Sequence, residues 1–546
     1  MFVFVLFNTE YMDITMRKVW YLKNLFHCKE NGWILITHDY MRTHFLELQE
    51  SITSRFFDQF EMNSFQIEEL NDVEQYFVDD DVFDSLESFY GTRTETLAYL
   101  FSQRYDKLEN RLFEIFEMIR LKHPKEKIEG VFNSLDAFES LRYVAKELKF
   151  PIVNYSFSAF RKPHGYRQTL YTATSNGYYW DANDSAHRYA NYLSEQCDKM
   201  PVFGNSELIA IFGKERTLPL IQLIDLLPKY EMGICCECFS LAPQVFSEYH
   251  VTDDDIFYEC KKLYNKDQIV VRSHAAHLDD IQVERDVVHN DPATTILSCK
   301  RVSSVLSQII LKVLLWKRTA VMRKGTSTLS FLCESDYSSE QIVNVRALNY
   351  YIFCYLIPND LMFSDSYWEW RMTNPSETEI YKKHLDFYIE KLNLPRFILT
   401  EKDETVRFKS ILKSRGCDEE LINILLADKH DFDIDYNTAS SRIVVNGKSY
   451  WRLNKLENTQ RHFYIELNES TDSIDFYPLD DVAGCAKLIS VQVNGQTLGV
   501  SQYTDFKYMP KVSGHYTLPI LKQDDKTIID IMWEYMSNKD FLNAHA

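Results

Sequence analysis

The chain has 546 residues, of which 45% are hydrophobic and 26% are charged, and its 60 basic and 80 acidic side chains give a formal net charge of −20. This length predicts several domains rather than one, and the composition is ordinary for a globular protein. The negative charge argues against non-specific nucleic-acid binding, which needs a positive surface facing the phosphate backbone.

The first part of the chain predicts an α/β domain over residues 1–200. A helix is expected at Tyr105–Leu121, and strands are expected at Phe2–Phe7, Gly32–Thr37, Ile128–Phe132 and Pro151–Tyr155. Alternating strands and helices are typical of a parallel sheet. The apolar run at the N-terminus is too short for a signal peptide or a membrane span, so the sequence favours a cytoplasmic protein.

The next part repeats this pattern and predicts a second α/β domain over residues 201–345. Its strand-like runs read LPLIQLIDLL, MGICCECF, QIVVRSH, TTILSC and TAVMR. We expect a strand at Thr295–Ser298, then a serine-rich turn, a buried helix at Gln308–Trp316 and a strand at Thr319–Met322.

The remaining sequence changes in character twice. Residues 346–430 predict helices that pack back on the core, and Gly416 is expected to end one of them. Residues 431–546 alternate apolar and polar positions, which predicts an antiparallel β domain. Two Asn-Gly pairs, Asn446-Gly447 and Asn494-Gly495, predict tight hairpins within it.

The serine-rich turn and the strand QIVVRSH together predict a phosphate site. A guanidinium matches phosphate oxygens, a histidine beside it can donate a proton, and small hydroxyl residues can cap a helix whose amides face an anion. Helix capping alone would also explain the serines. The candidate phosphate-binding residues are Arg272, His274, Ser303, Ser304, Ser307 and Gln308.

Residues 156–184 combine polar and aromatic side chains in what we interpret as a long loop. Such a mixture suits a sugar acceptor, although an ordinary loop would have the same composition. The candidate acceptor-binding residues are Arg161, Tyr166 and Tyr171. The candidate catalytic residues are Asp136, just past a predicted strand, Asp225, within PLIQLIDLL, and His164, within the loop.

The sequence predicts neither a metal site nor a bound cofactor. The acidic runs Asp79–Asp81 and Asp253–Asp255 do not follow clear buried strands, so we interpret them as solvated turns. The 11 cysteines include no C-x-x-C pair and are expected to be reduced. With 15 glycines in the chain, no glycine-rich phosphate loop of the Walker or dinucleotide type is present.

Two segments in order, QIVVRSHAAH and ILSCKRVSSVLSQIILKVLLWKRTAVM, resemble the C-terminal half of two-domain (GT-B) glycosyltransferases that build bacterial capsule and lipopolysaccharide. TLPLIQLIDL resembles that family's strand before the donor domain, and SIDFYPLDDVAGCAKLISVQVNGQTL resembles a small β domain appended to some members. The chain departs from the pattern at Ala275, where a proline is usual, and at Tyr477, where an aspartate is usual.

The resemblance implies two Rossmann-like domains facing a cleft, followed by the β domain. It implies transfer of a sugar from a nucleotide-sugar, which is a substrate rather than a cofactor, to a growing glycan or lipid-linked acceptor. The phosphate-binding residues would then hold the leaving group, and Asp136 or His164 would activate the acceptor hydroxyl. The protein would work in the cytoplasm or at the inner face of the membrane, held there by partners.

Two other functions stay open at this point. The same scaffold could carry a nucleotide-sugar epimerase, which would turn over without an acceptor. It could also serve as a non-catalytic glycan-binding or scaffold protein, which nucleotides would not stabilise.

Overall fold

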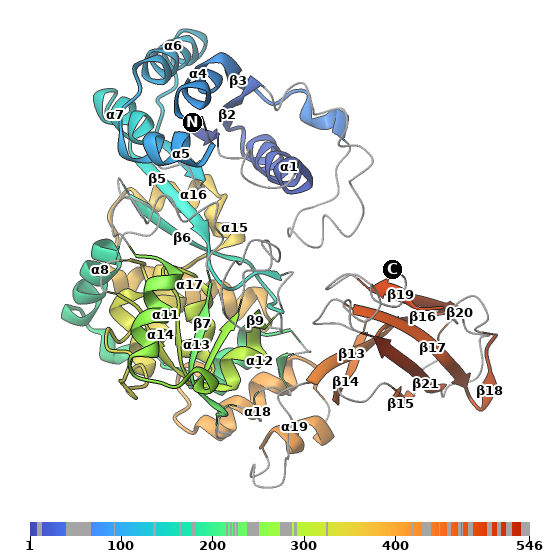
Figure 1. Ribbon diagram of the computed structural model, residues 1–546. Helices are drawn as coiled ribbons and strands as arrows, with labels where there is room; N and C mark the ends of the chain where they lie inside the picture. Colours follow the sequence, from blue (N-terminus) through green and yellow to red (C-terminus); the bar gives the residue numbers. More distant parts are fainter. Residues whose placement is uncertain are drawn as a thin grey trace.

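The computed structural model combines two mainly parallel sheets, flanked by helices, with two antiparallel sheets near the C-terminus (Figure 1). The α/β class with an antiparallel C-terminal part is therefore confirmed. The structure describes residues 1–7, 14–39, 67–91, 93–134, 138–162, 165–175, 182–214, 217–218, 221, 224, 228–236, 251–272, 287–288, 292–323, 326–417, 419–426, 438–446, 448–455, 460–467, 471, 473–478, 484–499, 505–509, 515–519 and 527–536.

The first sheet has the strand order β12-β6-β5-β4-β1-β2-β3 in the described part of the chain. Strands β1 to β5 are mutually parallel, and their order 3-2-1-4-5 is that of doubly wound nucleotide-binding sheets. Strands β6 and β12 extend this sheet in the antiparallel sense. The strands are β1 (Phe2–Leu6), β2 (Ile34–His38), β3 (Gln75–Val78), β4 (Gly130–Ser134), β5 (Ile152–Phe157), β6 (Leu170–Ser175) and β12 (Ile357–Pro358).

The four strands expected in this region are present, and β1 shows why they form. Its residues alternate between two apolar clusters, with Phe2, Phe4 and Leu6 in one and Val3 and Val5 in the other. A strand buried on both faces is typical of a parallel sheet. Helices α1 (Ile14–Asn31), α15 (Asn359–Met362) and α16 (Asp365–Arg371) cover the first face, and α4 (Asp80–Tyr90), α5 (Arg93–Ser102), α6 (Asp106–Lys122) and α7 (Glu139–Glu147) cover the second.

The second sheet has the order β11-β10-β7-β8-β9, and every pairing in it is parallel. Numbered along the chain, these strands again run 3-2-1-4-5 across the sheet. The strands are β7 (Tyr230–Cys235), β8 (Ile269–Arg272), β9 (Val287–Val288), β10 (Cys299–Ser303) and β11 (Thr319–Val321). The helices of this region are α8 (Ala182–Ser194), α9 (Asn205–Phe212), α11 (Asp253–Lys261), α12 (Pro292–Leu297) and α13 (Ile309–Leu315).

Two strand predictions in this region are wrong. Residues expected to form a strand at Thr295–Ser298 belong mostly to α12, and the strand begins at Cys299. Pro292 opens the helix, which suits the fixed φ of proline at the first helical position. The buried helix and the following strand are confirmed as α13 and β11. Leu218, Ile221 and Ile224, from the predicted strand LPLIQLIDLL, are buried residues of turns rather than of a strand.

Helices dominate the described residues between the second sheet and the C-terminal sheets. Gly416, with φ at +79°, directly follows the last turn of α18, as predicted. Strand β12 lies within this helical segment and returns the chain to the edge of the first sheet. The other elements are α14 (Val345–Tyr350), a π-helical turn (Tyr351–Tyr355), α17 (Glu377–Lys391), α18 (Glu404–Ser414) and α19 (Glu419–Leu426).

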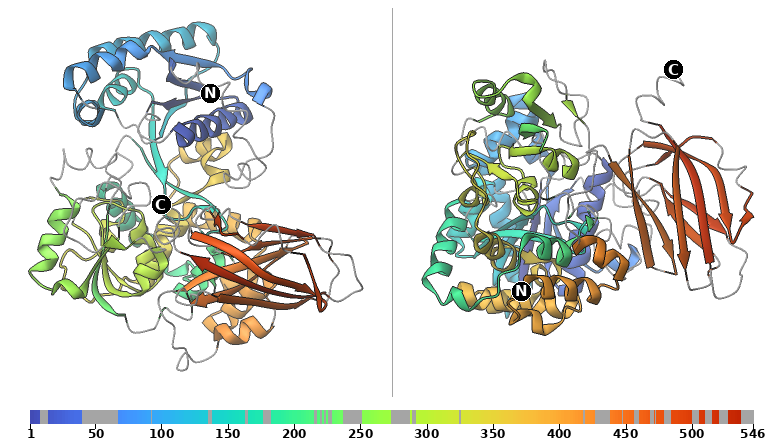
Figure 2. Two further views of the ribbon diagram at one scale, coloured as in Figure 1. Left: turned by 45° about the vertical axis from the view of Figure 1, so that its right-hand side comes forward. Right: turned by 90° about the horizontal axis from the view of Figure 1, so that it is seen from below.

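The C-terminal strands form two antiparallel sheets, β14-β13-β16-β20 and β15-β21-β17-β18, with β19 paired to β17. One apolar cluster draws on both sheets, as in a β-sandwich. The sandwich lies beside α18 and α19 (Figure 2). Its strands are β13 (Thr438–Val445), β14 (Lys448–Lys455), β15 (Gln460–Leu467), β16 (Ser473–Tyr477), β17 (Gly484–Val493), β18 (Gln496–Thr497), β19 (Lys507–Met509), β20 (Tyr516–Pro519) and β21 (Thr527–Met536).

Both predicted hairpins are confirmed. The strands β13 and β14 pair directly on either side of Asn446, whose φ is +48°. The turn between β17 and β18 has φ of +50° at Asn494 and +77° at Gly495. Positive φ at both central residues is the requirement of a type I′ turn, which Asn-Gly meets at low cost.

Candidate functional site

The carboxyl edge of the second sheet brings several of the predicted phosphate-binding residues together. The strand order reverses between β7 and β10, and ligands of doubly wound sheets bind outside the carboxyl ends of the strands at this position. In the β-ladder Ser303 lies opposite Ile234, and Arg272 lies opposite Cys235. Arg272, Ser303 and Ser304 therefore share this edge, next to the reversal.

Hydrogen bonds hold the edge in shape. The Ser304 hydroxyl donates to the Cys235 carbonyl over 2.6 Å, and the Cys236 amide donates to the Arg272 carbonyl over 2.9 Å. Ser303 is the last residue of β10 rather than a turn residue, and its side chain is fully buried. Burial raises the pKa of the nearby Tyr337 hydroxyl, and hydrogen bonding to Arg323 and Ser303 opposes that rise.

Ser307 caps the helix that follows this edge. The Ile309 amide donates to the Ser307 hydroxyl over 3.3 Å, and the Ile310 amide donates to the Ser307 carbonyl over 3.2 Å. Gln308 is the residue before α13, and its side-chain carbonyl oxygen is buried without a partner in the described part of the chain. Ser307 therefore has the helix-capping role that small hydroxyl residues commonly fill.

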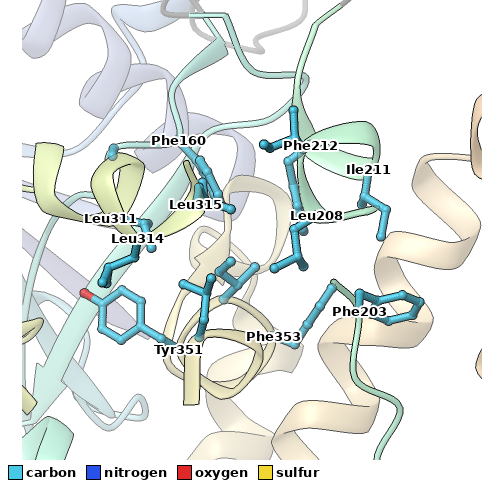
Figure 3. Close-up of a cluster of buried hydrophobic side chains, with 14 of the residues drawn as sticks. Phe160, Phe203, Leu208, Ile211, Phe212, Leu311, Leu314, Leu315, Tyr351 and Phe353 are labelled. Atoms are coloured by element: carbon cyan, nitrogen blue, oxygen red, sulfur yellow. The ribbon is translucent and has the colours of Figure 1, made fainter. Parts of the chain in front are cut away.

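The segment between β5 and β6, residues 158–169, joins the two α/β units. Phe160 stacks on Phe212 at 5.2 Å, and both lie with Leu311 in a buried cluster of the second unit (Figure 3). The Arg167 amide donates to the Phe212 carbonyl over 2.7 Å. Gly213, directly after α9, forms an antiparallel bridge with Tyr166 of the segment.

Arg161 lies in this joining segment. Its Nε donates to the Ser158 carbonyl over 3.1 Å, and its guanidinium lies 4.7 Å from the centre of the Phe157 ring. Loss of hydration on burial lowers the pKa of Arg161 to about 10, so the group still carries its charge at neutral pH. Tyr166 is buried nearby in the segment, with the Lys312 ammonium of α13 at 5.4 Å from its ring.

Tyr171 lies beneath the segment rather than on its surface. The structure places it in β6, fully buried, where we expected a loop. Its hydroxyl donates to the Asn359 side chain over 3.1 Å and accepts a hydrogen bond from Lys23. The stretch interpreted as a long loop is therefore partly a strand of the first sheet, paired with β5 on one side and β12 on the other.

The other candidates lie outside the described residues. They are the three catalytic candidates, Asp136, His164 and Asp225, and the phosphate-binding candidate His274.

The acidic run Asp79–Asp81 follows strand β3 directly, and only Val78 of that strand is fully buried. Its residues open α4, where acidic side chains are favoured by the helix dipole. Asp79 and Asp81 pair with basic residues of α6, and Asp80 lies 3.3 Å from Nδ1 of His38. The run Asp253–Asp255 likewise opens a helix, α11, rather than a solvated turn.

Two basic residues at the first sheet were missed from the sequence. His38 ends β2 and could have been found by the same strand-end rule that selected Arg272, had the strand been extended by one residue. Lys23 lies on a helix face and is 1% exposed, and no local pattern marks it because its contacts come from residues far away in the chain.

Neither a metal cluster nor a membrane span is found in the described part of the chain. No group of three or more His, Cys, Asp or Glu side chains there is arranged to hold a metal ion. None of the helices described is long and apolar enough to cross a bilayer. The ten described cysteines are not disulfide-bonded.

Comparisons with known proteins assign no family. No protein-family model matches the chain, and no curated protein matches it. Among solved structures, it is similar to the beta Kdo 2,7 transferase KpsC of Thermosulfurimonas dismutans, with 13% identity, a TM-score of 0.26 and coverage of 42% of this chain and 77% of that one. A TM-score this low carries no inference about fold or function.

Proposed function

We propose that the chain is a glycosyltransferase that moves a sugar from a nucleotide-sugar to a growing bacterial surface glycan. In this proposal residues 201–345 form the donor domain and residues 1–200 the acceptor domain, facing each other in the GT-B manner. Residues 346–430 pack back on both, and residues 431–546 form an accessory β domain.

The observation that supports the proposal most is the polar carboxyl edge at the strand reversal of the second sheet. Arg272, Ser303 and Ser304 meet there, next to the capped start of α13. A doubly wound sheet with these groups suits a phosphate-bearing nucleotide. Neither the residues after β1 (FNTEYMD) nor those after β7 (CECFSLAPQVFSEYHVT) contain glycine, which argues against a dinucleotide cofactor at either sheet.

The joining segment supports a second substrate. It comes from the first sheet yet packs against α9 and α13, so its side chains lie close to the donor domain. Arg161 and Tyr166 would help to bind the acceptor there, with Tyr171 holding the segment from below. This arrangement of donor edge and acceptor segment favours a transferase over an epimerase, which needs no acceptor.

The reaction breaks the bond between the anomeric carbon and the donor phosphate oxygen, and the electron pair stays on that oxygen. Arg272, His274 and the polar groups at Ser303, Ser304, Ser307 and Gln308 would surround and stabilise this developing charge. The acceptor oxygen bonds to the anomeric carbon, and its proton passes to a base. Asp136, His164 and Asp225 stay candidates for that base.

His38 is a further candidate for the base. It ends a strand of the acceptor sheet, and Asp80, at 3.3 Å, can hold its ring in one tautomer. An assay of His38→Gln would test this role, since loss of the base should lower the transfer rate while nucleotide binding is kept.

Thermal-shift screening with UDP, GDP, CMP and dTDP, each free and sugar-linked, tests the proposal. We expect one nucleotide to raise the melting temperature, and Arg272→Ala to remove that rise and to lower transfer rates by orders of magnitude. Lys300→Ala is the matched control, because Lys300 is an exposed cation near the amino end of β10 and should not affect binding. If no nucleotide stabilises the protein, a scaffold is favoured, and turnover of donor alone would indicate an epimerase.

A further inference from the structure

Arg161 keeps its charge without an acidic partner among the described residues. Some other shielded arginines have carboxylate partners, whereas Arg318 donates to the backbone carbonyls of Ile224 and Leu297. Arg188 pairs with Glu377, Arg301 with Glu231 and Arg407 with Glu207. Arg161 lies within ion-pair distance of no acidic side chain among the described residues, and its hydrogen bond to them goes to the Ser158 carbonyl.

The geometry leaves the outer edge of the Arg161 side chain available. The hydrogen bond to Ser158 uses Nε, and the flat face of the guanidinium packs on the Phe157 ring. These two contacts fix the plane of the group. The two Nη atoms are the part of a guanidinium that binds carboxylate or phosphate in a bidentate manner, and they are not engaged by the described residues.

A second cation reinforces the positive charge at this position. Phe157 stacks on Tyr171 at 5.0 Å between ring centres, and the ammonium of Lys23 lies 4.8 Å from the first ring and 4.9 Å from the second. Arg161 and Lys23 contact the same Phe157 ring, so they lie within about 10 Å of each other, roughly one Debye length in dilute salt. Two basic side chains therefore lie on one aromatic ring in a chain whose net charge is −20.

We propose that Arg161 binds a carboxylate or phosphate group of the acceptor, so that the acceptor is an acidic glycan. The assignment of this anion to the acceptor rests on the proposed glycosyltransferase function. The donor phosphates are expected at the edge of β7 and β10, whereas Arg161 lies in the segment that follows β5 of the other sheet. Bidentate binding by a rigid guanidinium would orient the acceptor, because it fixes a plane as well as a position.

Isothermal titration calorimetry without nucleotide tests this inference. The probes are oligoglucuronate, a neutral glucose oligomer of equal length, and inorganic phosphate. We expect the wild-type protein to bind oligoglucuronate or phosphate, with a preference that identifies the anion, and to bind the neutral oligomer much more weakly. Arg161→Gln should weaken anion binding about ten- to a hundredfold, the range expected for loss of a charge-assisted pair of hydrogen bonds.

Two further variants keep the test decisive. Arg161→Lys retains the positive charge but loses the planar pair of Nη donors, so it should weaken anion binding by a smaller factor than Arg161→Gln. This comparison remains informative even if the glutamine variant folds poorly. Arg120→Gln is the matched control, because Arg120 also lies on an aromatic ring, Phe150 at 5.2 Å, but on the exposed side of α6. Unchanged anion affinity in both Arg161 variants, or no binding of either anion, would overturn the inference. Nucleotide binding is measured separately, so the donor-site proposal stands or fails independently.

Discussion

The buried ion pair between Arg188 of α8 and Glu377 of α17 offers a sharp test of how the helical segment is held to the second unit. Two hydrogen bonds of 2.9 and 3.1 Å join the groups, whose side chains are 11% and 10% exposed. The Glu377 carboxylate also accepts from the Tyr350 hydroxyl and the Cys354 thiol, at 3.3 and 3.0 Å. The pair therefore lies within a network in which every partner is buried.

Replacing Glu377 with glutamine keeps the shape but leaves the Arg188 charge buried without a counter-charge. Removing one partner of a buried pair costs about 3–5 kcal/mol. In a cooperative unit of about 150–250 residues, each kcal/mol lowers the melting temperature by roughly 2–4 °C. We therefore expect Glu377→Gln to lower the calorimetric transition of the α/β part by roughly 6–20 °C.

The same substitution at Glu390, on the same helix, is the control. Glu390 pairs with Arg396 at 3.2 Å, but these side chains are 74% and 62% exposed, so Glu390→Gln should change stability by less than about 1 kcal/mol. The double variant Arg188→Met/Glu377→Gln should recover much of the loss, because it removes the unpaired charge. Equal transitions for Glu377→Gln and Glu390→Gln would refute the reasoning.

Two further predictions concern acid and the β-sandwich. Burial favours the protonated acid at Glu377, but Arg188 and the hydrogen bonds outweigh it and lower the pKa, so this stabilisation is present above about pH 4.5 and is lost as the pH falls below it. The melting temperature between pH 3 and 7 should therefore fall more steeply toward acid in the wild type than in Glu377→Gln, and parallel curves would contradict this. Gly495→Ala should lower the free energy of unfolding of the β-sandwich by about 1 kcal/mol, because φ at Gly495 is +77°. Gly499→Ala is the control and should leave that free energy nearly unchanged, because an added Cβ there meets no neighbour. Equal urea midpoints of the sandwich transition in the two variants would argue against the type I′ turn.

The sequence predicted the elements whose apolar pattern is local. Strand β1 is a continuous apolar run, and the Asn-Gly pairs have one favourable turn geometry, so both were found. Strand β10 was misplaced because its sequence contains Lys300 and Arg301. Arg301 is buried all the same, since Glu231 and Glu340, far away in the chain, neutralise it. No window of the sequence contains these partners together.

The residues of the candidate site that were predicted also have a local sequence pattern, whereas Lys23, which was missed, has none. The strand-end rule and the serine-rich turn found Arg272, Ser303 and Ser304, because the carboxyl ends of parallel strands meet at one edge. Lys23 was missed because its acceptor, the Tyr171 hydroxyl, lies 148 positions further along the chain. Tyr171 itself was taken for a loop residue because β6, read as LYTATS, is largely polar. The threonines of β6 are buried all the same between β5 and β12, and the Thr172 hydroxyl donates to the Ser156 carbonyl over 3.3 Å. The local sequence does not show this partner, so the polar run resembled a loop.

The joining segment links the two α/β units at the residues that surround Arg161. Phe160 is anchored in the core of the second unit by Phe212, whereas the Arg161 side chain lies on Phe157 of the first sheet. Any movement of one unit relative to the other must therefore change the backbone between these contacts. If nucleotide binding draws the units together, the two sites are coupled, and thermodynamic linkage requires the coupling to be reciprocal. We expect the nucleotide to change oligoglucuronate affinity by the same factor as oligoglucuronate changes nucleotide affinity, and a factor of one in both titrations would mean that the units bind independently.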